Sequence, residues 1–175
     1  MTNYRRHFVP GGSYFFTVVA ADRPQGLLTK HMGLLRKSFK TVMEEKPFVI
    51  DAMVVLPDHL HCLWTLPPED KDYSTRWKNI KALFSKGLQK TEARSESRIS
   101  KGERGIWQRR YWEHAIRDDE DYARHVDYIH YNPIKHGYVE KLIDWPHSSF
   151  HRYVKAGIYT SDWAASSGIE DLDFE

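Results

Sequence analysis

Two apolar runs joined by a Pro-Asp pair restrict the fold of this chain more than any other feature. Residues 48–56 and 60–66 have the length and composition of strands, and Pro57 and Asp58 between them are typical turn residues. We therefore predict a β-hairpin whose second strand begins at His59. Because side chains alternate along a strand, one face carries His59 and His61, and the opposite face carries the core residues Leu60, Cys62, Trp64 and Leu66.

The rest of the chain alternates between strand and helix patterns. Residues 13–21 and 106–116 are aromatic and β-branched, whereas residues 27–45 and 72–89 repeat apolar side chains at helical spacing. A further helix should begin near residue 118 and end at about 131, since Asn132 precedes a proline, and a last short helix should lie within 148–156. This order predicts an α+β fold with a ferredoxin-like or RRM-like antiparallel sheet of four to five strands and helices packed on its faces.

The composition fits one domain. A chain of 175 residues with 41% hydrophobic content can bury one sizeable core. We expect a domain over residues 1–157, with a mobile basic loop at 91–105, and a tail over 158–175. A single cysteine excludes an internal disulfide, and no apolar run approaches the roughly 18 residues that would span a bilayer. The start of the chain lacks the apolar stretch of a secretory signal, so we expect a cytoplasmic protein with no membrane partner.

Positive charge is concentrated in the middle of the chain. Although the formal net charge is only +2, residues 76–110 hold eleven Lys or Arg against three Glu. Such a stretch is often only a solvated face. Here it is interleaved with Trp77, Trp107, Tyr111 and Trp112, and cations together with aromatic rings suit phosphate contacts and base stacking, which favours a nucleic-acid partner.

The histidine pair suggests metal chemistry. His59 and His61 on one strand face would supply half of a metal site, with ordinary strand histidines as the alternative. A histidine-triad hydrolase would need a third histidine where Leu63 stands, and zinc deaminases or structural zinc sites need cysteines that this chain lacks. His114, His125, His130 and His136 are further candidate ligands, although a lone histidine is usually structural.

A tyrosine in the helix predicted after residue 118 completes the hypothesis of a metal-assisted nuclease. Tyr128 and Asn132 are four residues apart and would lie on one side of that helix. The buried stripe should consist of Tyr122, Val126 and Ile129, which leaves Tyr128 on another side, together with Asp121, rather than in the core.

Three motifs follow one another at residues 56–67, 107–114 and 127–137, and shorter ones lie at 4–6, 11–12 and 144–146. In this order they resemble those of the REP-associated tyrosine transposases, which belong to the single-tyrosine branch of the HUH endonucleases. The likeness covers roughly residues 4 to 163. It implies metal-dependent cleavage and strand transfer of single-stranded hairpin DNA, with a repetitive palindromic hairpin as substrate and a covalent 5′-phosphotyrosine intermediate.

The resemblance also assigns roles to residues. It implies that Tyr128 is the nucleophile and that His59, His61 and Asn132 hold Mg²⁺ or Mn²⁺. Asn132 stands where related transposases have a glutamine, and its alternative role is a helix cap before Pro133. His125, one turn before Tyr128, is a candidate for removing the phenol proton. By analogy, the DNA contacts involve the basic residues Arg5, Arg6, Lys78, Lys81, Arg109 and Arg110.

Two alternatives stay open at this stage. One is a replication or mobilisation nickase of the same chemical class. The other is a non-catalytic nucleic-acid-binding module on a similar sheet, in which His59 and His61 are incidental. The chain could act as a monomer or a homodimer.

Overall fold

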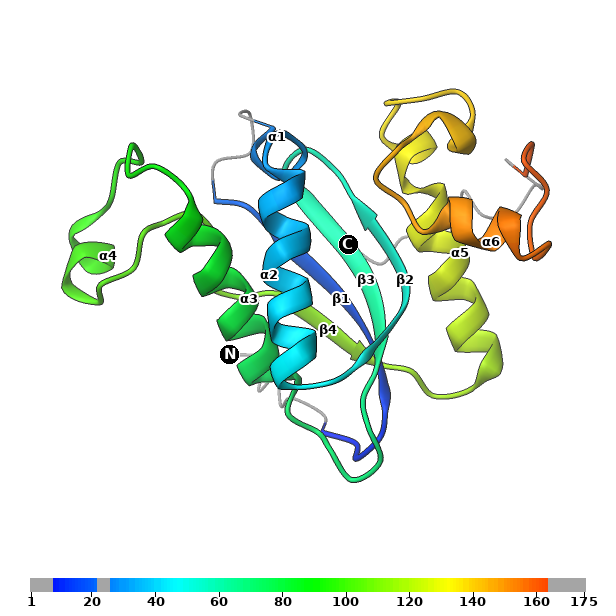
Figure 1. Cartoon of the computed structure of the whole chain (residues 1–175), viewed down its shortest axis with the longest axis horizontal. Helices are drawn as coiled ribbons and strands as arrows, with labels where there is room; N and C mark the ends of the chain where they lie inside the picture. The colour runs from blue at the N-terminus through cyan, green and yellow to red at the C-terminus, as the bar shows by residue number, and fades with distance from the viewer. Residues whose placement is uncertain (1–7, 22–25, 164–175) are drawn as a thin grey trace, which may run out of the picture.

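A four-stranded antiparallel sheet forms the centre of the computed structural model, which describes residues 8–21 and 26–163 (Figure 1). The strand order β2-β3-β1-β4 and the chain order of strands and helices are those of a ferredoxin-like fold, which confirms the predicted α+β class. The elements are β1 (Ser13–Val19), α1 (Leu27–Lys30), α2 (Met32–Glu45), β2 (Val49–Val55), β3 (His59–Thr65), α3 (Tyr73–Gly87), α4 (Glu96–Ser100), β4 (Trp112–Ala115), α5 (Asp119–Lys135), a 3-10 helix (Leu142–Asp144) and α6 (Phe150–Lys155).

The predicted hairpin is present as β2 and β3. Val55 pairs with Leu60 and Val54 with His61, and the backbone N–H of Leu56 donates to the carbonyl of His59 at 2.8 Å to close the turn. On its other side β3 pairs with β1, where Thr17 lies opposite His61. The histidine strand is therefore an inner strand of the sheet.

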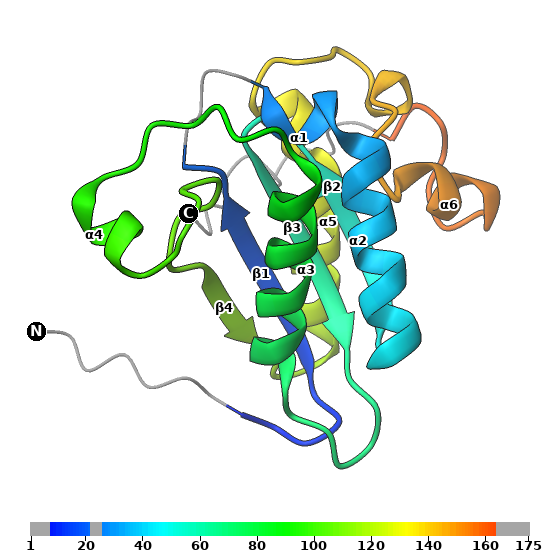
Figure 2. The same ribbon diagram turned by 60° about the vertical axis from the view of Figure 1, so that its left-hand side comes forward.

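Helices cover both faces of the sheet (Figure 2). Helices α2 and α3 lie on one face, where Phe16, Trp64 and Trp77 belong to the larger hydrophobic core. Helix α5 lies on the other face, where Phe15 and Ile129 belong to a second, smaller core. Residues that alternate along a strand thus enter different cores, as the pleat of a strand requires.

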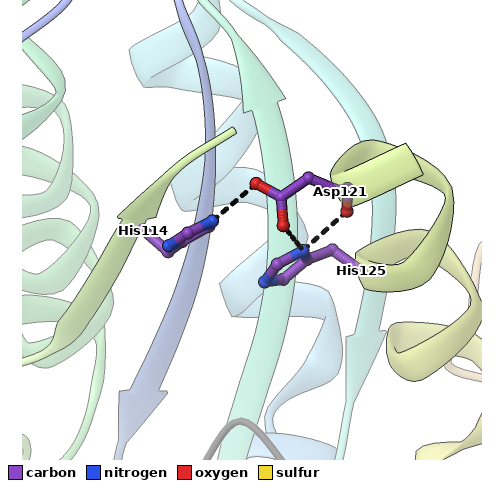
Figure 3. Close-up of side chains that lie close together, drawn as sticks. All are labelled: His114, Asp121 and His125. Atoms are coloured by element: carbon purple, nitrogen blue, oxygen red, sulfur yellow. Dashed lines mark hydrogen bonds and ion pairs between the residues drawn. The ribbon is translucent and has the colours of Figure 1, made fainter. Parts of the chain in front are cut away.

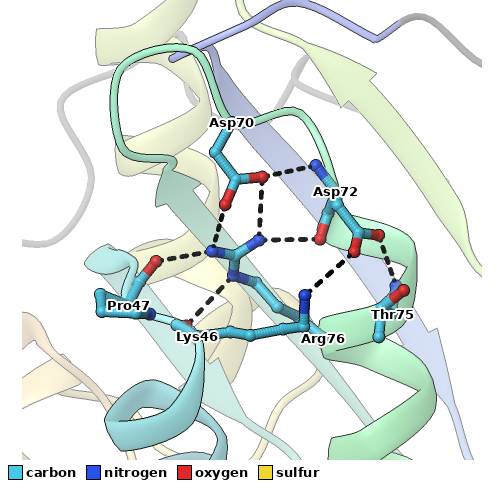
Figure 4. Close-up of polar contacts among 6 residues, drawn as sticks. All are labelled: Lys46, Pro47, Asp70, Asp72, Thr75 and Arg76. Atoms are coloured by element: carbon cyan, nitrogen blue, oxygen red, sulfur yellow. Dashed lines mark hydrogen bonds and ion pairs between the residues drawn. The ribbon is translucent and has the colours of Figure 1, made fainter.

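A buried arginine links the start of α3 to the end of α2 (Figure 4). Arg76 is almost fully buried, and its guanidinium donates to the carbonyls of Lys46 and Pro47 at 3.2 and 2.7 Å and to that of Asp72 at 2.8 Å. The carboxylate of Asp70 accepts two further hydrogen bonds, at 3.2 and 2.7 Å. Hydrogen bonds and a paired carboxylate thus compensate the burial of this charge.

The segment predicted as a mobile loop at 91–105 contains structure. It includes the short helix α4, and the side chain of Arg104 donates to the carbonyls of Leu88 and Gln89 at 2.9 and 2.7 Å and pairs with Glu92. The prediction missed this because it used composition. Composition shows that the side chains of a segment are polar, but it does not show which backbone carbonyls accept hydrogen bonds from them in the folded chain.

The predicted helix over 27–45 is divided at His31 into α1 and α2, so a single helix there was wrong. The predicted end of the later helix at 131 was also wrong, because α5 continues through Pro133 to Lys135. All residues from 128 to 133 are buried, so tertiary packing outweighs the local preference of a residue before proline. The aromatic strand predicted over 106–116 is shorter than expected and spans only β4, although Trp107 forms an isolated bridge with Ala20.

The described residues that follow α6 pack against the domain. The ring of Tyr159 stacks on those of Tyr153 and Trp163. The division at 157 stays a prediction, and residues 164–175 of the predicted tail lie outside the described residues. Among the described helices, none has the length and apolarity needed to cross a membrane. The cytoplasmic location also stays a prediction.

Candidate active site

The histidine pair lies on the face of β3 that α5 covers. The imidazole rings of His59 and His61 are 5.0 Å apart, and the residues are 7% and 0% exposed. The Nδ1 atom of His59 is 2.7 Å from a carboxylate oxygen of Asp58, and the Nδ1 atom of His61 is 2.9 Å from the hydroxyl of Thr17. These contacts engage Nδ1 and orient both rings, so Nε2 is the nitrogen with which each could bind a metal ion.

Helix α5 brings Tyr128 to this pair. The ring centroids of Tyr128 and His61 are 5.2 Å apart, and the phenol ring also lies edge-on to Phe15. Tyr128 is 1% exposed, so the expectation that it lies outside the core was wrong. The stripe formed by Val126 and Ile129 is not the whole buried surface of α5, because neighbouring segments cover further parts of the helix.

A lysine that the sequence interpretation missed contacts the phenol. The Nζ atom of Lys135 donates a hydrogen bond to the hydroxyl of Tyr128 at 3.3 Å and lies 4.9 Å from the ring centroid. A cation at this position stabilises a phenolate electrostatically. The seven-residue spacing, about two helical turns, was the available signal, since it places Lys135 on the same side of α5 as Tyr128.

Asn132 and His136 follow Tyr128 at intervals of four residues, Asn132 within α5 and His136 directly after it. The ring of His136 lies 5.1 Å from that of His59, so this exposed histidine is next to the proposed metal site. Asn132, between Tyr128 and His136, is fully buried and donates from its Nδ2 to the carbonyl of Tyr128 at 2.9 Å. Its Oδ1 is buried without a hydrogen-bond partner among the described residues. A buried amide oxygen of this kind suits a cation.

A second group of polar side chains joins β4 to the start of α5 (Figure 3). A carboxylate oxygen of Asp121 is 2.7 Å from Nε2 of His114, and the backbone carbonyl of Asp121 is 2.7 Å from Nδ1 of His125. The potential ligand atoms of these three residues lie within 4.8 Å of one another, so they could hold a metal ion. The rings of His114 and His125 are stacked, and that of His125 is 4.9 Å from Phe15, which also touches Tyr128.

Hydrogen bonding fixes the charge of this group. Burial alone would raise the pKa of Asp121, but hydrogen bonds from Arg117 and His114 outweigh it, and the pKa is held far below its usual range. Burial lowers the pKa of His125, which favours its neutral form. The group therefore combines a carboxylate with at least one neutral imidazole. The four-residue spacing of Asp121 and His125 was visible in the sequence, whereas the approach of His114 depends on the sheet.

The predicted DNA-binding residues do not gather around Tyr128. Lys78 and Lys81 lie on α3, on the opposite face of the sheet, where Lys81 donates to the carbonyl of Gln108 at 3.1 Å. Arg109 is paired with Glu103 at 2.8 Å, and Arg110 is exposed. Arg5 and Arg6 lie outside the described residues. The structure thus brings His59, His61 and Tyr128 together, places Asn132 one helical turn after Tyr128, and puts Lys78, Lys81 and Arg109 elsewhere.

Known proteins resemble the chain over most of its length. The family model described as transposase IS200 like matches residues 9–132. A protein of Haemophilus influenzae (strain Rd) with the name "Putative REP-associated tyrosine transposase" is 49% identical over 97% of both chains. The REP-associated tyrosine transposase of Escherichia coli K12 is 47% identical over 94% of this chain and 92% of its own. A solved structure, of a REP-associated tyrosine transposase bound to a REP hairpin, superimposes with a TM-score of 0.83 at 45% identity and covers 99% of this chain and 96% of its own.

Proposed function

The chain belongs to the family of IS200-like transposases, which confirms the resemblance drawn from its motifs, and we propose that Tyr128 is the nucleophile with which it cleaves and rejoins hairpin DNA. One observation carries this assignment: the phenol of Tyr128 lies beside the ring of His61 within a single chain. The hairpin substrate is inferred from the solved relative, which is bound to a REP hairpin.

The proposed reaction is a phosphoryl transfer to Tyr128. Its hydroxyl loses a proton and attacks the phosphorus, the bond from phosphorus to the 3′ oxygen breaks, and that oxygen leaves as a 3′-hydroxyl after taking up a proton. The 5′-phosphate stays on the tyrosine, and attack by another 3′-hydroxyl reverses the step and joins two strands. Lys135 favours the phenolate because its ammonium group lies against the phenol oxygen.

The residues present fit a divalent cation. His59, His61 and Asn132 would hold it, with His136 as a further candidate ligand, and Mg²⁺ or Mn²⁺ suits this mixture of imidazole and amide donors. The buried Oδ1 of Asn132, which has no hydrogen-bond partner among the described residues, supports this role over that of a helix cap. When bound, such an ion withdraws charge from the phosphate and orients it for in-line attack.

The proposal has three consequences, one for the oligomeric state of the active unit and two for the access of DNA to Tyr128. His61 and Tyr128 meet without help from another chain, which favours a monomer as the active unit. Because the Tyr128 phenol is almost fully buried, the substrate phosphate must displace part of its surroundings to reach it. Lys135 is exposed and lies over the phenol ring, so we expect its side chain to move on binding.

The test is the formation of a covalent protein–DNA adduct. Labelled single-stranded hairpin DNA with single-stranded flanks is incubated with the protein and Mn²⁺ or Mg²⁺, and products are separated under denaturing conditions. We expect an adduct that disappears with a chelator and in Tyr128→Phe. Tyr131→Phe is the matched control, since this buried tyrosine lies one turn further along α5 and should leave the adduct unchanged.

Other results would favour the alternatives. An adduct that survives in Tyr128→Phe refutes the assignment of the nucleophile. Cleavage without an adduct would indicate a hydrolytic nuclease. Binding without cleavage in either metal would indicate a non-catalytic module, and nicking of supercoiled plasmid in place of the isolated hairpin would indicate a nickase.

A further inference from the structure

We propose that a basic cleft between α3 and residues 88–109 binds the phosphate backbone of the double-stranded stem of the hairpin. This inference rests on the proposed function, because it assumes a hairpin substrate. The cleft has a volume of about 1000 Å³ and lies on the side of the sheet away from Tyr128. It would be a second DNA-binding surface, separate from the site where the strand is cut.

Hydrogen bonds hold residues 88–109, which form the wall of the cleft opposite α3. Arg104 donates to the backbone carbonyl of Ser85 in the last turn of α3 and to those of Leu88 and Gln89 just after it, and it pairs with Glu92. Arg98 donates to the carbonyl of Trp107 at 3.3 Å, and Arg109 donates to the hydroxyl of Ser97 at 2.9 Å. Two hydrogen bonds join the segment to α3: Trp107 donates from its Nε1 to the carbonyl of Lys81 at 3.3 Å, and Lys81 donates to that of Gln108 at 3.1 Å. The segment that carries α4 is therefore linked both within itself and to α3, and the cleft can exist before DNA arrives.

The charge of the cleft suits a polyanion. Its lining includes two carboxylates, and both are engaged in ion pairs, Glu92 with Arg104 and Glu103 with Arg109. The eight basic residues that line it are Lys78, Lys81, Lys86, Lys90, Arg94, Arg98, Arg104 and Arg109. The lining thus has a net excess of six positive charges, which attracts phosphate groups irrespective of base sequence.

The aromatic residues indicate which part of the hairpin the cleft fits. Trp107 is 7% exposed, and the Nζ atom of Lys81 covers its ring at 5.8 Å and that of Tyr111 at 5.1 Å. Trp107 is thus closed to a base, and half-buried Tyr111 has a lysine over its ring, whereas stacking platforms with open rings are the usual means of binding single strands. A duplex stacks its own bases and presents phosphates outward, so a surface of cations without open rings suits the stem.

The edge strand β4 connects the cleft to the catalytic face. Tyr111 lies in the cleft, whereas the next residue, Trp112, lies on the α5 side and is 39% exposed. The ring of Trp112 touches that of Phe15, which in turn touches that of Tyr128. A stem in the cleft would thus let its single-stranded flank cross β4, stack on Trp112 and continue to Tyr128.

The experiment compares two triple variants with equal loss of charge. Lys78→Gln/Lys86→Gln/Arg94→Gln neutralises three exposed residues of the cleft, and Lys37→Gln/Lys40→Gln/Lys155→Gln neutralises three exposed residues outside it. The affinities of both variants and the unmodified chain for a blunt hairpin are measured by fluorescence anisotropy between about 50 and 300 mM KCl. An unstructured strand of equal length serves as the second probe.

We expect the affinity for the hairpin to depend less on salt in the cleft variant than in the unmodified chain, and the variant outside the cleft to keep the dependence of the unmodified chain. Each lost phosphate contact lowers the slope of log affinity against log salt by about 0.9, so three contacts lower it by roughly 2.7. Equal slopes for the two triple variants would overturn the proposal. An equal loss of slope on the unstructured strand would also overturn it, because it would place single-stranded DNA in the cleft.

Adduct formation at saturating flanked hairpin separates this inference from the proposed function. An adduct in all proteins, with slopes that do not differ, would refute the cleft and leave the function of Tyr128 intact. Absence of the adduct from the unmodified chain, with a reduced slope in the cleft variant, would refute the proposed chemistry and support the cleft as a stem-binding surface.

Discussion

Replacement of Phe15 by leucine should slow adduct formation strongly, while it lowers the free energy of unfolding only moderately. Phe15 is fully buried on the α5 side of the sheet, and its ring lies 5.6 Å from that of His61 and 5.9 Å from that of Tyr128. The rings of His125 and Trp112 pack against it at 4.9 and 5.6 Å. The side chain is therefore the common support of the proposed nucleophile and one proposed metal ligand.

Phe16 provides a matched control. It is equally buried, but it points to the opposite face, where its ring packs at 4.7 Å from Trp64 and at 5.4 Å from Tyr73 and Trp77. Truncation of a buried Phe to Ala costs about 3–5 kcal/mol, and leucine refills much of the cavity, so each Phe→Leu variant should lose roughly 1–3 kcal/mol of unfolding free energy. The two variants should thus be destabilised to a similar extent.

Their reaction rates should differ. If the loss of Phe15 lets the phenol of Tyr128 shift by about 1 Å, adduct formation should slow by roughly 10- to 100-fold, since misplacement on this scale carries that cost. Phe16→Leu should stay within about threefold of the unmodified chain, because its neighbours are structural. Single-turnover adduct formation at saturating DNA and metal measures the rate, and urea unfolding measures stability. Equal rates for the two variants at equal stability would refute the view that Phe15 positions Tyr128.

Three further predictions concern other parts of the molecule. Arg76→Met should lower the unfolding free energy by about 3–5 kcal/mol in urea titrations, because it strands buried carbonyls, and a loss below 1 kcal/mol would contradict this reading. Asp58→Asn should weaken metal activation by about 10–100-fold in a Mn²⁺ titration of adduct yield, since Asp58 orients His59; an unchanged midpoint would argue against metal binding there. The hydrogen bonds from Arg104 lower the pKa of Glu92 to about 2, so the stabilisation of the 88–105 segment should be complete above about pH 4.5 and be lost as the pH falls through 2. Amide exchange in this segment, corrected for intrinsic rates, should rise in that range, and Glu92→Gln should remove the part of this rise that comes from the Glu92–Arg104 pair.

Much of the sheet could be predicted from the sequence because its signals are local. Alternation along 60–66 assigned Leu60 and Trp64 to one core and His61 to the other face, and the structure confirms both. The approach of His114 to Asp121 could not be predicted in this way. It depends on the pairing of β4 with β1, which places His114 opposite Phe15, and no periodicity within either segment records that pairing.

Helix α5 shows a different limit. The stripe through Val126 and Ile129 was identified correctly as buried, but the inference that Tyr128 is less buried assumed that the helix packs on one side only. A helix that crosses a sheet and is also covered by a later segment has no such exposed side. His130 shows this second contact, since its Nε2 lies 2.8 Å from the hydroxyl of Ser149. Burial from a segment so distant in sequence cannot be read from helical spacing.

Neighbouring residues of β3 have different roles, because one face of the sheet packs the larger apolar core and the other carries the proposed site. Along β3, Leu60 and Cys62 enter the core beneath α2 and α3, while His59 and His61 face α5. A slip of β3 by one residue would bury imidazoles in the apolar core and turn leucine toward the proposed metal. The large aromatic core on the first face therefore fixes the register on which the site depends. This explains how the site can consist of buried polar groups on an inner strand: the opposite face supplies the stability that these groups do not.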